Sequence, residues 1–168
     1  MIDRQRLADL EENLNLLYEK LGMFERDLIL TSSTPAKFEL KQQIKREILP
    51  GIRRYEAEYW ELYPREAILI SDEDAQSQLV QVEQAVKSIE RISPVEYPPE
   101  LVPLLQDIRA KLEELDKAAS AKLKVVLPLI PAIASYELEM DTEGFMYQTW
   151  KAIKGLVRRP GVSKELEL

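Results

Sequence analysis

The stretch LADLEENLNLLYEKLGMFERDL, residues 7–28, decides the fold of this chain. Its apolar residues recur at alternating steps of three and four, a heptad pattern that predicts a helix burying one seam. Charged residues, among them Glu11, Glu12 and Lys20, lie off this seam. The seam itself consists of Leu7, Leu10, Leu14, Leu17, Leu21, Phe24 and Leu28.

A short polar turn, TSSTP at 31–35, separates this helix from a second one. Thr34 is the expected cap of the second helix, with Pro35 at its first position. Because the linker is short, the two helices are expected to lie antiparallel, as a hairpin over residues 1–63. LPG at 49–51 predicts a kink or a break in the second helix, since proline lacks a backbone donor. The apolar positions of this helix are Ile44, Ile48, Ile52, Tyr55, Tyr59 and Leu62.

The second half of the chain predicts a small helical bundle over residues 72–159. A third helix is expected to begin at SDEDAQ, with Ser71 or Asp72 as its cap. A fourth carries one apolar stripe from Leu101 through Leu115 to Leu123, and a fifth opens at residue 145. Pro160 ends that helix, and residues 160–168 are expected to form a disordered tail.

The segment VVLPLIPAIASYELEMD, residues 125–141, breaks the helical pattern. Its apolar part is too short to span a bilayer, and Pro128 and Pro131 disfavour a helix. From residue 136 apolar and acidic residues alternate, which predicts a half-buried strand. A lone strand needs a partner, so the segment either pairs with 124–127 or is extended and packs against the bundle, which we favour. The predicted fold class is therefore mainly α, with one short extended or β-like segment near 125–141.

Composition excludes several classes of function. The chain has no histidine and no cysteine, so a Ser-His-Asp triad, a thiol nucleophile and a thiolate zinc site are all impossible. A net charge of −7 argues against nucleic acid as a partner. The N-terminal residues lack an apolar segment of the kind found in secretion signals, and a cytoplasmic location is expected. We expect no cofactor and no small-molecule substrate.

Four acidic residues near the end of that segment are the densest cluster of carboxylates. They could form a hard-cation site or an acid–base pair. Alternation instead favours a solvent-facing edge whose charges prevent strand pairing, so we predict neither a metal site nor catalytic residues. The four are Glu137, Glu139, Asp141 and Glu143.

Two aromatic residues are candidate contacts with a partner or a membrane. Trp60 lies off the apolar stripe of the second helix, about 100° from Tyr59, and is expected to be exposed. Trp150 belongs to a basic amphipathic helix that could lie on anionic lipid or dock on an acidic partner. The alternative is an ordinary packed helix with basic residues in its last turns. The basic residues concerned are Lys151, Lys154 and Arg158.

Two parts of the chain resemble helical modules of cyanobacterial multidomain signalling proteins. The first part carries LYEKL at 17–21 and KFELKQQI at 37–44. The second carries KLKVVLPLIP at 122–131 and SYELEMDTEG at 135–144. Together the resemblance covers roughly residues 7–48 and 101–157. Such effector-associated modules are attached to nucleoside-triphosphatase (STAND-type) switches and to TIR-like or caspase-like domains of conflict systems.

The resemblance implies an adaptor that couples one domain to another and implies no catalytic residue. With the heptad seams, it predicts a non-enzymatic module that oligomerises or recruits a protein partner through apolar helical surfaces. The alternative is a helical effector that associates with a membrane, using residues 125–134 and the basic helix 145–159.

Overall fold

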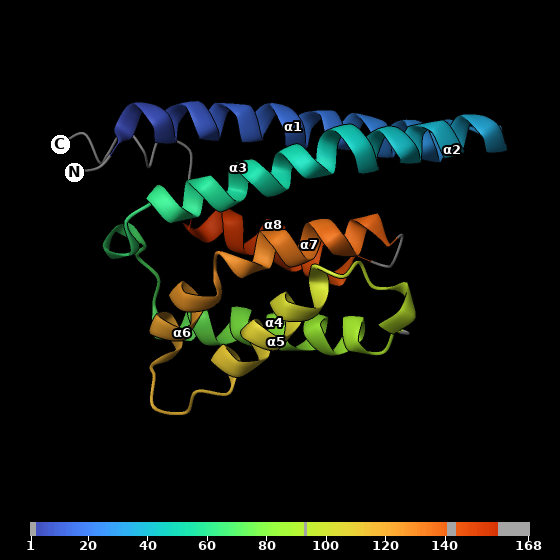
Figure 1. The fold of residues 1–168 in the computed structure, drawn as a ribbon. Coiled ribbons are helices and arrows are strands. Elements are labelled where there is room, and N and C mark those ends of the chain that lie inside the picture. The colour runs from blue at the N-terminus through green and yellow to red at the C-terminus, as the bar shows by residue number, and fades with distance from the viewer. Residues whose placement is uncertain (1–2, 93, 141–143, 158–168) are drawn as a thin grey trace.

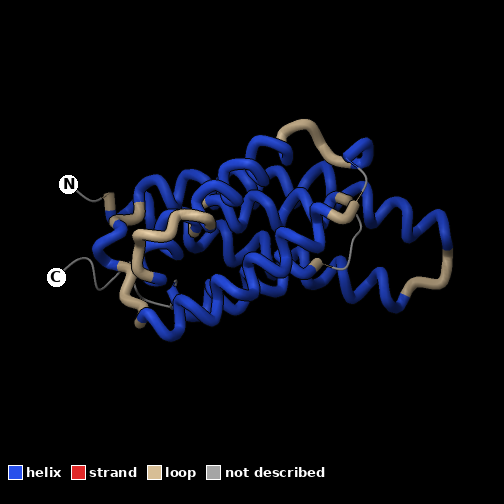
Figure 2. Tube along the Cα trace, turned by 90° about the horizontal axis from the view of Figure 1, so that it is seen from below, coloured by secondary structure: helices blue, strands red, loops and turns tan. Residues whose placement is uncertain are grey.

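A computed structural model describes residues 3–92, 94–140 and 144–157, and within these residues the chain is helical, without a strand (Figure 2). The prediction of a mainly α fold is confirmed. The helices form three tiers, with the N-terminal helices at one side and α4, α5 and α6 at the other (Figure 1). Helices α7 and α8 lie between them and contact both sides.

The first tier consists of α1 (Arg4–Leu30) and a run of helix that returns along it. The return run comprises α2 (Thr34–Gln43), the π-helical turn η1 (Ile44–Ile48) and α3 (Leu49–Leu62). The side chain of Asp3 caps α1 by accepting from the backbone N–H of Arg6 at 2.9 Å. Ser33, not Thr34, caps α2, so the helix begins one residue earlier than predicted and places Pro35 at its second position.

LPG was predicted to kink or break the second helix; the helix is not broken there, but a π turn interrupts its regular α-helical geometry just before Pro50. In an α-helix the ring of Pro50 would clash with the carbonyl four residues earlier. Over Ile44–Ile48 the turn is wider, and the N–H of Leu49 bonds to the carbonyl of Ile44, five residues back. The helix therefore continues through Pro50. Gly51 then lets α1 approach closely, since a Cβ at this position would lie 3.2 Å from Leu17 Cδ1.

The remaining helices begin after a short 3-10 turn, η2 (Arg65–Ala67). Ser71 caps the first of them by accepting from the N–H of Asp74 at 3.1 Å, and acidic residues fill its first turn, as predicted. A further 3-10 turn, η3 (Pro94–Glu96), precedes the next helix. The helices are α4 (Asp72–Glu90), α5 (Leu101–Leu112), α6 (Ala119–Val126), α7 (Leu129–Glu139) and α8 (Phe145–Val157).

The stripe predicted as one fourth helix is two helices, α5 and α6. The chain leaves the helix after Leu112, and Leu115, predicted to be apolar core, is exposed. A new N-terminus follows, and the Asp72 carboxylate accepts from the backbone N–H of Ser120 at 3.0 Å. Hydrogen bonds from Ser120 lower the pKa of Asp72. This cap from the start of α4 allows α6 to fold back against α4.

The prediction of an extended segment near 125–141 is wrong, because residues 129–139 form the helix α7. Pro128 is the N-cap residue of this helix and Pro131 lies in its first turn. There the backbone N–H groups have no acceptor within the helix, so prolines cost little. A two-residue turn at 127–128 separates α7 from α6.

Glu137 also departs from the prediction, because it is buried rather than solvent-facing. Its two carboxylate oxygens accept from the backbone N–H groups of Met146 and Tyr147, each at 3.1 Å. These are orphan donors of the first turn of α8, so Glu137 caps that helix from α7. The alternating acids therefore do not share an edge. Asp141 and Glu143 lie outside the described residues.

The two halves of the chain share one hydrophobic core. Its buried residues come from all three tiers, including Leu14 of α1, Val86 of α4 and Ile133 of α7. Helix α3 packs directly on α7. The ranges 1–63 and 72–159 predicted as separate units are thus in contact, and residues 160–168 lie outside the described residues.

Candidate interaction surface

The distal arm is the part of the first tier that reaches beyond the other helices (Figures 1 and 2). It comprises the end of α1 from Met23, the turn at 31–33, and α2. Large apolar side chains are exposed on it: Ile29 and Leu30 are each 81% exposed and Phe38 is 63% exposed. Apolar residues gathered at one projecting end are typical of an interaction site.

Helix α2 has little cover from the rest of the chain. None of its residues is buried, and its main contacts are with α1 and with the π turn that follows it. A helix of ten residues is only marginally stable when it has no apolar face to bury. Packing along α1 therefore holds the arm, and its outer side remains available to another molecule.

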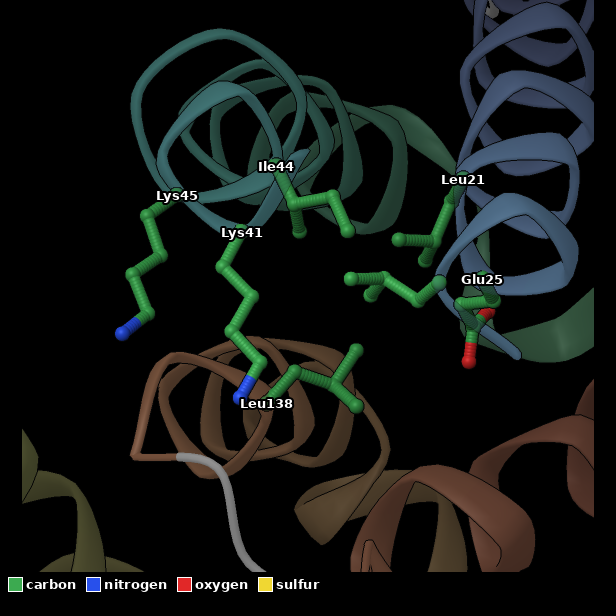
Figure 3. A pocket seen from close by; sticks show the side chains of 7 residues that line it. Leu21, Glu25, Lys41, Ile44, Lys45 and Leu138 are labelled. Carbon is green, nitrogen blue, oxygen red and sulfur yellow. The ribbon is translucent and has the colours of Figure 1, made fainter. Parts of the chain in front are cut away.

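A cavity of about 240 Å³ lies at the base of the arm. Three elements line it: Leu21 and Glu25 come from α1, Ile44 from the return helix and Leu138 from α7 (Figure 3). Its inner wall is apolar, and lysines stand at one side while Glu25 stands at the other. The full lining is Leu21, Glu25, Leu28, Lys41, Ile44, Lys45 and Leu138.

Glu25 places a half-buried carboxyl in this cavity. Burial raises the pKa of Glu25, and the nearby charge of Lys151 partly opposes that shift. Burial also raises the pKa of Tyr147 to about 12, with a further contribution from Glu25. An apolar wall with charges of both signs at the rim suits an amphipathic side chain better than a small ion.

The predicted contact Trp60 lies in the interior, and the expectation that it is exposed is wrong. Its ring packs edge-on against Tyr59, at a centroid distance of 4.9 Å, and against Trp150 at 5.9 Å. The position of Trp60 in the sequence was misleading, because α7 and the Trp150 ring of α8 cover the side of α3 that a two-helix hairpin would leave open.

Trp150 is fully buried as well, so α8 turns its aromatic side inward. Two of its basic residues lie over tyrosine rings. Lys154 Nζ is 3.7 Å from the ring centroid of Tyr18, and Lys151 Nζ is 4.7 Å from that of Tyr147. Arg158 lies outside the described residues. Within the described part, α8 matches the ordinary packed helix that was the alternative reading.

A buried hydrogen-bond network joins α1, α3 and α8, and no pattern in the sequence predicted it. The Tyr18 hydroxyl donates to Glu56 Oε2 at 2.7 Å, and Trp60 Nε1 donates to Glu56 Oε1 at 3.2 Å. Trp150 Nε1 in turn donates to the Tyr18 hydroxyl at 3.1 Å. One signal was present: Glu56 lies four residues after Ile52 and three before Tyr59, on the apolar stripe.

The described residues contain no group of three or more acidic side chains placed to hold a metal ion. Glu137 uses both oxygens as a helix cap, and Glu139 lies 3.6 Å from Arg53. Glu137 and Glu139, which the alternating pattern predicted on one edge, therefore have separate structural roles.

Among the described residues, no single helix is both long and apolar enough to cross a membrane, although α6 and α7, bent by 54°, together meet that test on length and composition. The apolar side chains of this pair, such as Val126, Ile130 and Ile133, belong to the core. Lipid contact through residues 125–134 would require the core to open.

The basic helix and both tryptophans are thus largely engaged within the chain, whereas the distal arm and its cavity are open to a partner. Comparison of the chain with protein-family models, with curated proteins and with solved structures gave no match.

Proposed function

We propose that this chain is a non-enzymatic interaction module that binds a protein partner through the distal arm. The observation that carries the proposal is that three large exposed apolar side chains, Ile29, Leu30 and Phe38, come together on the projecting end of the first tier. Burying an exposed leucine-sized side chain in a partner contributes about 1.5–3 kcal/mol towards offsetting the entropic cost of association.

The cavity supports a helical partner. An amphipathic helix lying along α2 could place one apolar side chain between Leu28, Ile44 and Leu138. An acidic residue one turn away on that partner would then approach Lys41 or Lys45 at the rim. We therefore expect an amphipathic, acidic helix as the partner.

The interior groups support a structural rather than a catalytic role. Among the residues that the structure describes, the buried carboxylates are Glu56 and Glu137, and the oxygens of both accept hydrogen bonds from side chains or backbone amides. These contacts fix neighbouring helices in place. The adaptor role implied by the resemblance is compatible with such a scaffold.

A site-specific photo-crosslinker tests the proposal. We would incorporate p-benzoylphenylalanine at Phe38 and, as the matched control, at exposed Val80 of α4, and irradiate cells producing each protein. Adducts specific to position 38 and lost in the variant Ile29→Glu are expected. The same adducts at both positions, or none at position 38, would rule the arm out.

Liposome flotation addresses the membrane alternative. Because the apolar face of α7 is buried, we expect no flotation with neutral or anionic vesicles. Flotation with anionic vesicles that Lys151→Glu abolishes would favour the membrane role over the adaptor role.

A further inference from the structure

Helix α1 carries a second apolar stripe on its outer surface. The outer stripe consists of Leu16, Met23 and Leu30, which are seven residues apart and so lie on one line. They are 58%, 51% and 81% exposed, while the seam of α1 faces α3 and the core. A helix that is apolar on two sides has one side left for another molecule.

Charged residues flank the outer stripe in an unusual order. Glu19 and Arg26 lie on one side of it, and Lys20 and Asp27 lie on the other. The members of each pair are seven residues apart, roughly 10.5 Å along the helix, which is too far for an ion pair. None of the four has an opposite charge three or four residues away, where pairing within a helix occurs.

The same order is self-complementary when two α1 helices meet antiparallel with a two-fold axis at Met23. Leu16 then lies opposite the second copy's Leu30. In such a pair each flank meets the same flank of the other helix. Lys20 therefore approaches Asp27 of the second copy, and Glu19 approaches its Arg26.

Parallel pairing would also bring opposite charges together, but it has a specific cost. Asp9 lies on the line of the outer stripe, seven residues before Leu16. In a parallel pair it would face Asp9 of the second copy, and like charges directly opposite are destabilising. The aligned helix dipoles would also repel, whereas antiparallel dipoles attract.

We propose that the outer stripe of α1 binds a second copy of this chain in antiparallel orientation, through Leu16, Met23 and Leu30 and the four flanking charges. This inference goes beyond the proposed function, because its partner is a second copy of the chain and its surface is the outer stripe, which shares only Met23 and Leu30 with the distal arm. The apolar contact extends over roughly 21 Å of helix. Such an interface is small, so we expect a reversible dimer with a dissociation constant on the order of micromolar.

Charge exchange measured by sedimentation equilibrium tests the pairing. Lys20→Glu would place a negative charge beside Asp27 of the second copy, at two symmetric places in each dimer. This repulsion should weaken association about tenfold. Adding Asp27→Lys exchanges the charges and should restore the wild-type constant. Met23→Glu should leave a monomer, and Val80→Glu on α4, the matched control, should leave the constant unchanged. Circular dichroism melts verify that each variant folds.

Cysteine crosslinking tests the orientation, because the chain has no cysteine of its own. Met23→Cys lies on the proposed axis and should oxidise to a covalent dimer. Leu16→Cys alone should not, but a mixture of Leu16→Cys and Leu30→Cys chains should form a mixed dimer. Rapid self-crosslinking of Leu16→Cys would overturn the antiparallel arrangement.

Failure of this inference is distinguishable from failure of the proposed function. A chain that stays monomeric at all concentrations overturns the dimer, yet crosslinking from position 38 to a different protein would still support the arm. Loss of crosslinking at position 38 with an intact dimer would leave the outer stripe as the functional surface.

Discussion

The indole N–H of Trp150 donates to the hydroxyl of Tyr18 at 3.1 Å, across 132 residues of sequence. This bond joins α1 to α8. The same hydroxyl donates to buried Glu56, so one oxygen atom links three helices. Removing the hydroxyl of Tyr18 therefore tests how much a single oxygen atom contributes to stability.

Tyr18→Phe should lower the free energy of unfolding by about 1–3 kcal/mol, because Glu56 and Trp150 would each lose a buried partner. Urea unfolding at neutral pH measures this change. The matched control is Tyr55→Phe in α3, since the Tyr55 hydroxyl makes no hydrogen bond within the described residues. An equal loss in both variants would show that the network contributes nothing beyond general packing.

Glu137→Gln should destabilise the chain, and the effect should depend on pH. The glutamine side chain has one acceptor oxygen, whereas two backbone N–H groups each need an acceptor. The backbone N–H that loses its acceptor should lower the free energy of unfolding by about 1–3 kcal/mol. Burial raises the pKa of Glu137 above its ordinary value of 4.5, and the two amide bonds only partly oppose this.

The sign of the pH dependence follows from that shift. The folded chain keeps the Glu137 proton to a higher pH than the unfolded chain does. The stability contributed by this group is therefore fully present below pH 4.5, and it declines as the pH rises through the pKa of the folded state. The difference between wild type and Glu137→Gln should therefore shrink with rising pH. Urea titrations at several pH values measure it, with exposed Glu61→Gln as control. A constant difference would contradict the shift.

Arg53→Lys should cost about 1–2 kcal/mol despite keeping the charge. The Arg53 guanidinium carbon lies 3.7 Å from the ring centroid of Tyr136, and Nε donates to Ser135 Oγ at 2.8 Å. Lysine cannot stack and bond in this way, so the contact of α3 with α7 would weaken. Thermal unfolding checks this. Exposed Arg54→Lys, one residue on, should change stability by less than about 0.5 kcal/mol.

Two glycines should respond in opposite directions. Gly51→Leu should destabilise, because even a Cβ there would lie 3.2 Å from Leu17, where α1 and α3 meet. Gly22→Ala should stabilise by about 0.5–1 kcal/mol, since it lies within α1 and a Cβ there has nothing within 4 Å. Differential scanning calorimetry of both variants compares them. A stable Gly51→Leu protein would mean that the helices can separate at little cost.

The spacing of apolar residues in the sequence predicted a helix correctly wherever one face of that helix is buried along its whole length. The apolar positions of α4 and α8, such as Val86 and Ile153, lie in the core as their spacing indicated. Periodicity failed at Leu115, because the same spacing continued across a loop. Nothing in the sequence marked Asp72 as a distant cap that would allow a new helix to begin at residue 119.

The segment 125–141 misled for two physical reasons. Prolines disfavour a helix interior, but Pro128 is the N-cap residue of α7 and Pro131 lies in its first turn, where prolines are tolerated. Alternating acids suggested a solvent edge, but Glu137 is needed inside as a cap for α8. The burial of Trp60 was equally unpredictable, because it depends on Trp150, ninety residues later, being brought against it by the packing of three tiers.

The π turn ahead of Pro50 has a consequence for how this chain can vary. Because the turn holds one residue more than an α-helical turn, it accommodates that residue locally, within one wider turn of helix. Removing a residue from 44–48 would restore an α-helical turn ahead of Pro50, where the proline ring would clash with the carbonyl four residues earlier, and would displace the buried Ile44 and Ile48. The length of this turn is thus fixed from two directions, by the proline that follows it and by the core residues within it, so a one-residue deletion here should destabilise the junction between the arm and the bundle.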